Sequence, residues 1–380
     1  MTKLGNICKF QSGGTPAKGE SAYYGGKIPW ITTVALNGGM IGNESAIEWI
    51  TLKALRESAA KLVPAFSIMI GTRVGVGKVA INREEMSTSQ DIISLIGIND
   101  ARWSKPYICR FLQAKSDFLN AQARGATIKG IKIEVLSELD IPEITLVEQQ
   151  RIAYVFDNIS TLILKKQEQL RQMDLLIKSR FVEMFGDADL AQTRPEWRSV
   201  SEIGTVVGGA TPKTTNDEFW DGLYRWITPA ELENESGYIF DSVRKITEAG
   251  VKSCALTELP VGTVILSSRA PIGKVAIAGN TFYCNQGFKN IICNQDINPV
   301  FLNSLLRMNT RYLNSLGRGA TFKEISKAIV ENIRIPVPPR THQDRFAAFV
   351  AEVDKSKLAV KQSLEKLETL KKSLMQQYFG

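Results

Sequence analysis

Residues 73–81 read RVGVGKVAI and residues 269–277 read RAPIGKVAI, so the same run occurs twice at an offset of 196. The match extends along the chain in both directions. At this offset SGGTP (12–16) and PWIT (29–32) return as GGATP (208–212) and RWIT (225–228). At an offset of 194, RGAT (124–127), IP (141–142) and FG (185–186) return at 318–321, 335–336 and 379–380. A period of this length is too long for a solenoid repeat. It indicates a duplicated domain with two similar sites.

The bulk composition is that of a globular protein, and its charge favours a polyanionic partner. The chain has 380 residues, of which 44% are hydrophobic, enough for two or more domains with their own cores. Its 47 basic and 39 acidic residues give a net charge of +8. This balance favours an anionic partner such as nucleic acid without identifying it.

Cysteine usage and hydropathy indicate a soluble cytoplasmic protein. The five cysteines, at positions 8, 109, 254, 284 and 293, are odd in number and form no C-x-x-C pair, so they indicate neither a disulfide framework nor a zinc ribbon. No signal peptide follows Met1, and no uncharged apolar stretch approaches the ~20 residues of a membrane span.

The globular part of each copy has the pattern of an α+β domain. Short β-rich runs, such as 66–70 and 78–81, alternate with Gly/Asn/Pro-rich turns and one or two short helices. One such helix is expected within 51–61 and again within 247–258. Each of these segments starts with a threonine suited to an N-cap and stops before a proline.

A long amphipathic helix follows each globular part, over about 146–184 and 341–379. Apolar residues at steps of three and four form a heptad seam. The seam positions are Ile152, Phe156, Ile159, Ile163, Leu170, Met173 and Ile177 in the first helix, and Phe346, Val350, Val353, Val360, Leu364, Leu367 and Leu374 in the second. The seams are interrupted by Lys166, Arg180, Lys357 and Lys371.

Helices of this length, roughly 55 to 60 Å, cannot bury their apolar faces against one small domain. We therefore expect two globular domains separated by two long helices that form an antiparallel coiled coil, with a pseudo-two-fold relation between the copies. The expected boundaries are 1–145, 146–186, 187–340 and 341–380, with a linker at 187–196. The charged helices could also pack against another protein.

Catalytic motifs are missing. The stretch 71–79 resembles a phosphate loop, but five residues separate its outer glycines and Val79 stands where Ser or Thr would bind magnesium. Residues 337–340 lack the Asn or Asp and the aromatic of an amino-methyltransferase motif. The sequence contains no Asp-x-Lys or Glu-x-Lys, as a metal-dependent nuclease needs, and only one histidine, His342.

The order of these motifs, their duplication and the two long helices resemble the specificity (S) subunit of type I restriction–modification systems. The carrying residues are the Thr-Pro turn, Trp-Ile-Thr, Arg-x-x-x-Gly-Lys-Val-Ala, Gly-Ala-Thr, and Ile-Pro-x-Pro-Pro followed by Gln and a helix starting Arg-Ile-Ala or Arg-Phe-Ala. The first copy departs from the pattern at 141–145, which reads IPEIT where the second copy reads IPVPP.

The resemblance implies that each globular copy is a target-recognition domain for one half of a bipartite double-stranded DNA site. It implies that the helices act as a ruler and dock two modification (methyltransferase) subunits, joined by restriction (endonuclease/translocase) subunits in the full complex. The S subunit itself is then no catalyst and holds no cofactor or metal. S-adenosylmethionine, ATP and Mg²⁺ would bind the partner subunits.

Matched cations are the candidates for phosphate contacts, because charge supplies affinity without sequence information. They are Arg73, Lys78, Arg124, Lys129, Arg269, Lys274, Arg318 and Lys323. Base-reading residues should differ between the copies, because the half-sites differ. The candidates are Tyr23, Tyr24, Asn37, Lys213, Asn216 and Arg225. Gln90 and Gln286 align, which favours a structural role, and Trp30 and Trp226 are expected in the core.

Two other functions stay open at this stage. A scaffold would tether two enzyme subunits without reading DNA sequence, and a fused restriction-enzyme fragment would be active by itself. Salt-sensitive selection of one bipartite sequence by the assembled complex distinguishes the DNA-recognition hypothesis from both.

Overall fold

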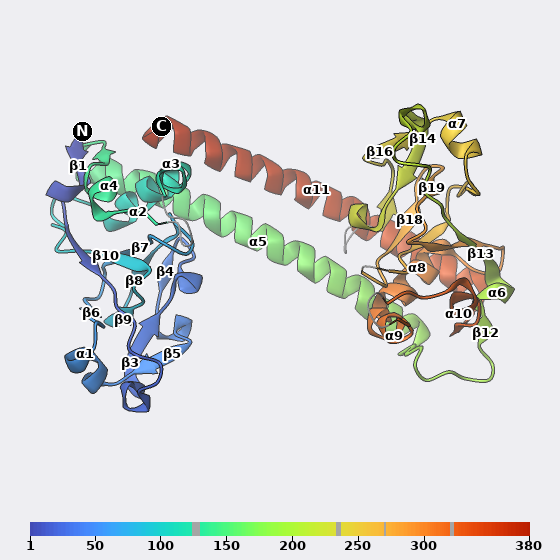
Figure 1. Cartoon of the computed structure of the whole chain (residues 1–380), viewed down its shortest axis with the longest axis horizontal. Coiled ribbons are helices and arrows are strands. Elements are labelled where there is room, and N and C mark those ends of the chain that lie inside the picture. Colours follow the sequence, from blue (N-terminus) through green and yellow to red (C-terminus); the bar gives the residue numbers. More distant parts are fainter. Residues whose placement is uncertain (124–129, 233–236, 270, 320–322) are drawn as a thin grey trace. The chain divides into compact units, whose positions relative to one another are not determined.

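The computed structural model describes residues 1–123, 130–232, 237–269, 271–319 and 323–380. They form two compact units: unit 1 contains residues 1–167 and 362–380, and unit 2 contains residues 168–361. Each unit holds one globular head and one end of each long helix, α5 (Leu146–Phe185) and α11 (Arg340–Phe379) (Figure 1). The division between the units therefore falls inside both helices.

The head of unit 1 is built on two mixed sheets (Figure 1). The strand orders are β2-β10-β7-β8-β4 and β5-β3-β9-β6, and β1 pairs with β11. The strands are β1 (Thr2–Lys3), β2 (Lys9–Ser12), β3 (Tyr24–Ile31), β4 (Met40–Ile41), β5 (Glu48–Ile50), β6 (Leu62–Val63), β7 (Ile68–Gly71), β8 (Val79–Asn82), β9 (Met86–Thr88), β10 (Ile92–Ile96) and β11 (Asp140–Ile141). The helices are α1 (Leu52–Glu57), α2 (Lys105–Ala114), α3 (Ser116–Gln122) and α4 (Ile133–Ser137).

The head of unit 2 repeats this topology as β13-β20-β17-β18-β15, β16-β14-β19 and β12-β21, with an isolated bridge between Leu259 and Phe282 in place of the β6–β9 pairing. Its strands are β12 (Arg198–Ser199), β13 (Gly204–Gly208), β14 (Trp220–Ile227), β15 (Tyr238–Ile239), β16 (Arg244–Ile246), β17 (Val264–Leu266), β18 (Val275–Ala278), β19 (Tyr283–Cys284), β20 (Lys289–Cys293) and β21 (Arg334–Ile335). Its helices are α6 (Val200–Ile203), α7 (Glu248–Lys252), α8 (Pro299–Met308), α9 (Thr310–Ser315) and α10 (Lys327–Glu331). The registers also repeat, since Ile68 faces Ile81 and Val264 faces Ile277. The expected duplicated α+β fold is confirmed.

The heads contain more helix than the sequence analysis expected. Helix α1 starts where predicted, at the N-cap Thr51, but ends at Glu57. Helices α2 and α8 were not anticipated, although each has a clear start: Ser104 and Asn298 cap them, and a proline lies in the first turn. Both helices bury one apolar face, which explains their stability despite only ten residues each.

The two long helices pair antiparallel within each unit. In unit 2 the ring of Phe181 lies 5.4 Å from that of Phe346, and Asp174 accepts a hydrogen bond from Lys357 at 2.5 Å. Residue numbers thus rise on α5 as they fall on α11. In unit 1 the first turns of α5 meet the last turns of α11, with Phe156 stacked at 6.1 Å on Phe379. All fourteen predicted seam positions are buried or half-buried.

The far end of each helix completes the core of the head it reaches. In unit 1 the ring of Phe379 lies 5.2 Å from Tyr107 and 6.1 Å from Phe111. In unit 2 Phe185 lies 4.8 Å from Phe301, the residue that matches Tyr107 at the 194 offset. The repeated Phe-Gly pair therefore marks the same packing contact in both units.

The expected linker at 187–196 is irregular in structure but packs on unit 2. Ala188 and Leu190 are buried in its core. The buried Asn309 donates to the carbonyl of Ala188 and accepts from the Leu190 amide, both at 2.9 Å. None of the described helices is long and apolar enough to cross a membrane.

Candidate nucleic-acid interface

Three repeated loops meet in unit 1. The amide of Gly14, in the Thr-Pro turn, donates to Thr88 at 2.9 Å. From the same β9–β10 connection, Asp91 accepts from the Thr72 amide at 2.8 Å. Thr72 belongs to the β7–β8 loop, and its carbonyl accepts from the Ile131 amide at 2.8 Å. These bonds join the Thr-Pro turn, the Arg-x-x-x-Gly-Lys loop and Ile131, which follows the Gly-Ala-Thr motif in the sequence, into one loop cluster.

Unit 2 contains the same loop cluster, bond for bond. The Ala210 amide donates to the Cys284 carbonyl at 3.0 Å, the Ser268 amide to the Gly287 carbonyl at 2.8 Å, and the Ile325 amide to the Ser268 carbonyl at 3.0 Å. Each of these residues matches its unit 1 counterpart at the 196 or 194 offset. The duplicated motifs therefore encode a duplicated surface.

Two repeated glycines explain why the loops require this sequence. A Cβ on Gly13 would lie 2.2 Å from the Ser89 carbonyl, and one on Gly209 would lie 2.1 Å from the Cys284 carbonyl. Gly77 and Gly273 have φ angles of 81° and 88°, which residues with a side chain rarely adopt.

Aromatic side chains of β3 and β14 donate hydrogen bonds to backbone carbonyls of the Thr-Pro turns. The indole of Trp30 donates to Gly14 at 3.1 Å, and that of Trp226 donates to Ala210 at 3.0 Å. Both tryptophans are buried, as the sequence analysis expected. The hydroxyl of Tyr24 donates to Pro16 at 2.8 Å. Burial, reinforced by the negative charge of Glu48, raises the pKa of this phenol above its ordinary value.

The chemistry beside the turn differs between the heads. In unit 2 Trp220 replaces Tyr24, and its indole donates to Lys213 at 3.2 Å. Arg244 occupies the position of Glu48, with its guanidinium carbon 3.6 Å from the centre of the Trp220 ring. A carboxylate in one head thus corresponds to a guanidinium in the other, on the same supporting frame.

The predicted phosphate-binding cations fall into three groups. Arg73, Lys78, Arg318 and Lys323 are exposed, while Arg269 and Lys274 are half-buried. The ammonium of Lys274 donates to the Leu232 carbonyl at 2.7 Å, which gives this lysine a structural partner. Arg124 and Lys129 lie outside the described residues.

Most of the predicted base-reading residues have local partners. Asn216 caps a short 3-10 helix through the Glu218 amide, and Asn37 accepts from the Gly39 amide. Tyr23 is half-buried and packs in a small core with Trp30. Arg225 pairs with Asp241 at 3.1 Å. Lys213 is exposed beside the Thr-Pro turn of unit 2.

Sequence reasoning missed Lys289, whose side chain contacts the loop cluster of unit 2. Its ammonium is 2.9 Å from Glu324 and 3.3 Å from the Ser268 hydroxyl. The matching residue in unit 1 is Ile93. The only signal in the sequence is a lysine at the start of a strand, KNIIC, that ends in three apolar residues.

The described residues contain no group of three or more His, Cys, Asp or Glu side chains that could hold a metal ion. All five cysteines are free thiols. Burial raises the pKa of Cys8, Cys109, Cys284 and Cys293 to about 12, as expected for apolar packing residues.

Comparison with known proteins adds an independent finding. The profile of a family described as "Type I restriction modification DNA specificity domain" matches residues 1–172 and 195–370. The type I restriction enzyme MjaIX specificity subunit of Methanocaldococcus jannaschii is 36% identical over 212 residues, 54% of this chain and 49% of the relative. The match therefore spans about half the length of that relative.

Solved structures share the fold. A chain from a structural study of complex assembly and conformational transition in a type I R-M system matches with a TM-score of 0.64 and 18% identity, over 100% of this chain and 96% of the other. The S subunit of the type I restriction–modification system from M. genitalium matches with a TM-score of 0.57 and 15% identity, over 100% and 95%.

Proposed function

Because the chain belongs to the type I restriction–modification DNA specificity family, we propose that it is the non-catalytic DNA-recognition subunit of such a complex. Each head reads one half of a bipartite site in double-stranded DNA. The helices set the spacer and dock two modification subunits, and restriction subunits complete the complex. S-adenosylmethionine, ATP and Mg²⁺ bind the partner subunits, and the complex acts on DNA in the cytoplasm.

One observation carries this proposal: the loop cluster is repeated bond for bond, while the side chains beside it diverge. Phosphates are alike at both half-sites, which suits a common backbone frame that carries exposed cations on each head, such as Arg73 in unit 1 and Arg318 in unit 2. Bases differ between half-sites, which suits the change from Glu48 to Arg244. The target-recognition domains are then 1–145 and 187–340, and the conserved helices are 146–186 and 341–380.

Genome-wide mapping of methylated sites, in cells carrying this chain with its partner subunits, tests the proposal. We expect one split motif with a fixed spacer. Glu48→Ala should change base preference in one half of the motif only, and Arg244→Ala in the other half only. The unaffected half serves as the internal control for each variant.

Other outcomes would contradict the proposal. Methylation without any sequence preference would favour a scaffold that tethers two enzyme subunits. Nuclease or methyltransferase activity from the purified chain alone would identify an enzyme. A change in both half-motifs from Glu48→Ala would show that the two heads do not read separate halves.

A further inference from the structure

A buried glutamine lies in the first turns of each long helix, where the head continues into it. Gln149 of α5 and Gln343 of α11 match at the 194 offset, and their exposed fractions are 1% and 0%. A buried amide has two N–H donors and one carbonyl acceptor to satisfy. Its partners therefore show what it holds in place.

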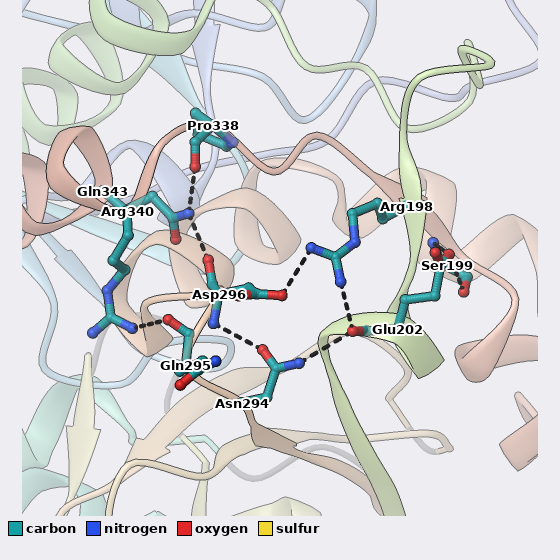
Figure 2. A network of polar contacts seen from close by, with 9 residues as sticks. All are labelled: Arg198, Ser199, Glu202, Asn294, Gln295, Asp296, Pro338, Arg340 and Gln343. Atoms are coloured by element: carbon teal, nitrogen blue, oxygen red, sulfur yellow. Dashed lines mark hydrogen bonds and ion pairs between the residues drawn. The ribbon is translucent and has the colours of Figure 1, made fainter.

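In unit 2 all three hydrogen-bonding capacities of Gln343 are used, and Figure 2 shows the two bonds that its Nε2 donates. Its Nε2 donates to the carbonyls of Asp296 at 3.0 Å and Pro338 at 2.7 Å. Its Oε1 accepts from the amide of Asn298 at 2.7 Å. Asp296 and Asn298 belong to the head loop before α8, and Pro338 belongs to the segment that enters α11.

In unit 1 Gln149 makes the same three bonds. Its Nε2 donates to the carbonyls of Arg102 at 3.1 Å and Ile144 at 3.0 Å, and its Oε1 accepts from the amide of Ser104 at 2.9 Å. Each partner matches its unit 2 counterpart at the 194 offset. The arrangement, here called the glutamine clamp, survives the change from VPP at 337–339 to EIT at 143–145.

The ion pairs around the clamp differ between the units. In unit 2 Asp296 is the acid, paired with Arg198 at 2.9 Å (Figure 2). In unit 1 Arg102 occupies the matching position and pairs with Glu143. The charge at this position has changed sign and its partner comes from a different place in the sequence, yet the three clamp bonds are unchanged. The retained feature is therefore the link between head loop and helix, made through backbone groups.

The length of the helix makes this link sensitive to angle. A helix of 40 residues is about 60 Å long at 1.5 Å per residue. A tilt of about 3° at its first turns moves its far end by about 3 Å, close to the ~3.4 Å rise of one base pair. Selecting a spacer to one base pair thus requires each helix to leave its head within a few degrees.

We infer that Gln149 and Gln343 are positioning residues that fix the direction in which each helix leaves its head, and so determine the spacer length of the DNA site. This inference rests on the proposed function. It concerns neither base reading nor catalysis.

Spacer selectivity gives a readout that loss of stability alone would not change. The test compares Gln149→Leu and Gln343→Leu, which keep the side-chain volume but lose the bonds, with Arg102→Ala and Asp296→Ala. The controls remove the ion pairs and keep the backbone carbonyls that the clamp uses. Each protein is assembled with its modification subunits and offered DNA with the spacer shortened or lengthened by one or two base pairs.

We expect complexes that contain a leucine variant to methylate DNA with the neighbouring spacers about tenfold more than wild-type complexes do. This factor corresponds to the loss of one recognition element. The half-site sequences should be unchanged. The controls should retain a single spacer. A single spacer in the leucine variants would overturn the inference. If circular dichroism shows that a leucine variant is unfolded, the Gln→Glu variants replace it, because they keep the acceptor and lose both donors.

A measurement without DNA separates this inference from the proposed function. Spin labels at Glu57→Cys in the head and Gln167→Cys in α5, in a Cys254→Ser, Cys293→Ser background that removes the two half-buried thiols, report one distance within unit 1. Gln149→Leu should broaden the distance distribution relative to wild type and Arg102→Ala. An unchanged width in a folded variant would refute the clamp. The absence of any split site in wild type would refute the proposed function instead.

Discussion

Phe379, at the end of α11, is predicted to stabilise the head of unit 1. Its side chain is 2% exposed and belongs to the same core as Tyr107, Phe111 and Phe156. Lys115 of this head also donates to the Phe379 carbonyl at 2.5 Å. Phe379→Ala would leave a cavity in the head although the residue belongs to the far end of the sequence.

The expected loss follows from the buried ring. Truncating a buried phenylalanine to alanine lowers the free energy of unfolding by about 3–5 kcal/mol. In a unit of 150–250 residues, 1 kcal/mol corresponds to about 2–4 °C in Tm. The melting transition of unit 1 should therefore fall by roughly 6–20 °C.

Differential scanning calorimetry of the full chain, with hydrogen exchange to assign each transition, measures this effect. Phe118→Ala is the matched control, because Phe118 lies in the same head but is 47% exposed. A surface substitution should change stability by no more than about 0.5 kcal/mol. Equal shifts for the two variants, or faster exchange confined to unit 2, would refute the placement of Phe379 in the core of unit 1.

Three further predictions concern the helix pair, the loop cluster and the thiols. Asp174→Leu should destabilise unit 2 by about 1–3 kcal/mol, because the buried Lys357 ammonium then loses this acceptor. Adding Lys357→Met should restore most of the loss, and additive losses in urea unfolding would contradict this. In the assembled complex, Lys78→Ala should reduce the slope of log K for DNA binding against log[salt] by about 0.9. Lys274→Ala should leave this slope nearly unchanged, because the Lys274 ammonium is bonded to backbone carbonyls. Anisotropy titrations that give equal slopes for the two variants would count against this. The pKa values of Cys8, Cys109, Cys284 and Cys293, raised to about 12, keep these thiols protonated at pH 8, so iodoacetamide should modify the native chain mainly at the half-buried Cys254. Rapid modification of Cys109 would argue against its burial.

Local and periodic features of the fold were predictable from the sequence. The heptad spacing of Ile152, Phe156 and Ile159 predicted a helix that the structure places at Leu146–Phe185. The repeated KVAI runs predicted β8 and β18, and the Thr51 cap predicted α1. Each of these signals lies within a few residues of the element that it specifies, which is why one sequence suffices.

Long-range contacts were not predictable in this way. The repeat of Phe185 at Phe379 was visible, but nothing local indicates that each ring packs in the head that its helix reaches. In the loop cluster, matched residue types concealed different environments. Lys78 is exposed, whereas its repeat Lys274 bonds to the Leu232 carbonyl. Sequence identity between the copies predicted the shared backbone frame and could not show which charges that frame leaves in solvent.

The crossing of α11 into unit 1 affects synthesis on the ribosome. Lys115 and Phe379 are 264 residues apart, a delay of roughly 13–53 s at about 5–20 residues per second. Throughout that interval the nascent first head lacks the Phe379 ring, which packs against Tyr107 and Phe111 in the folded unit. Translation speed and chaperone supply should therefore govern the soluble yield of this chain more strongly than that of a protein whose first domain folds from its own residues alone.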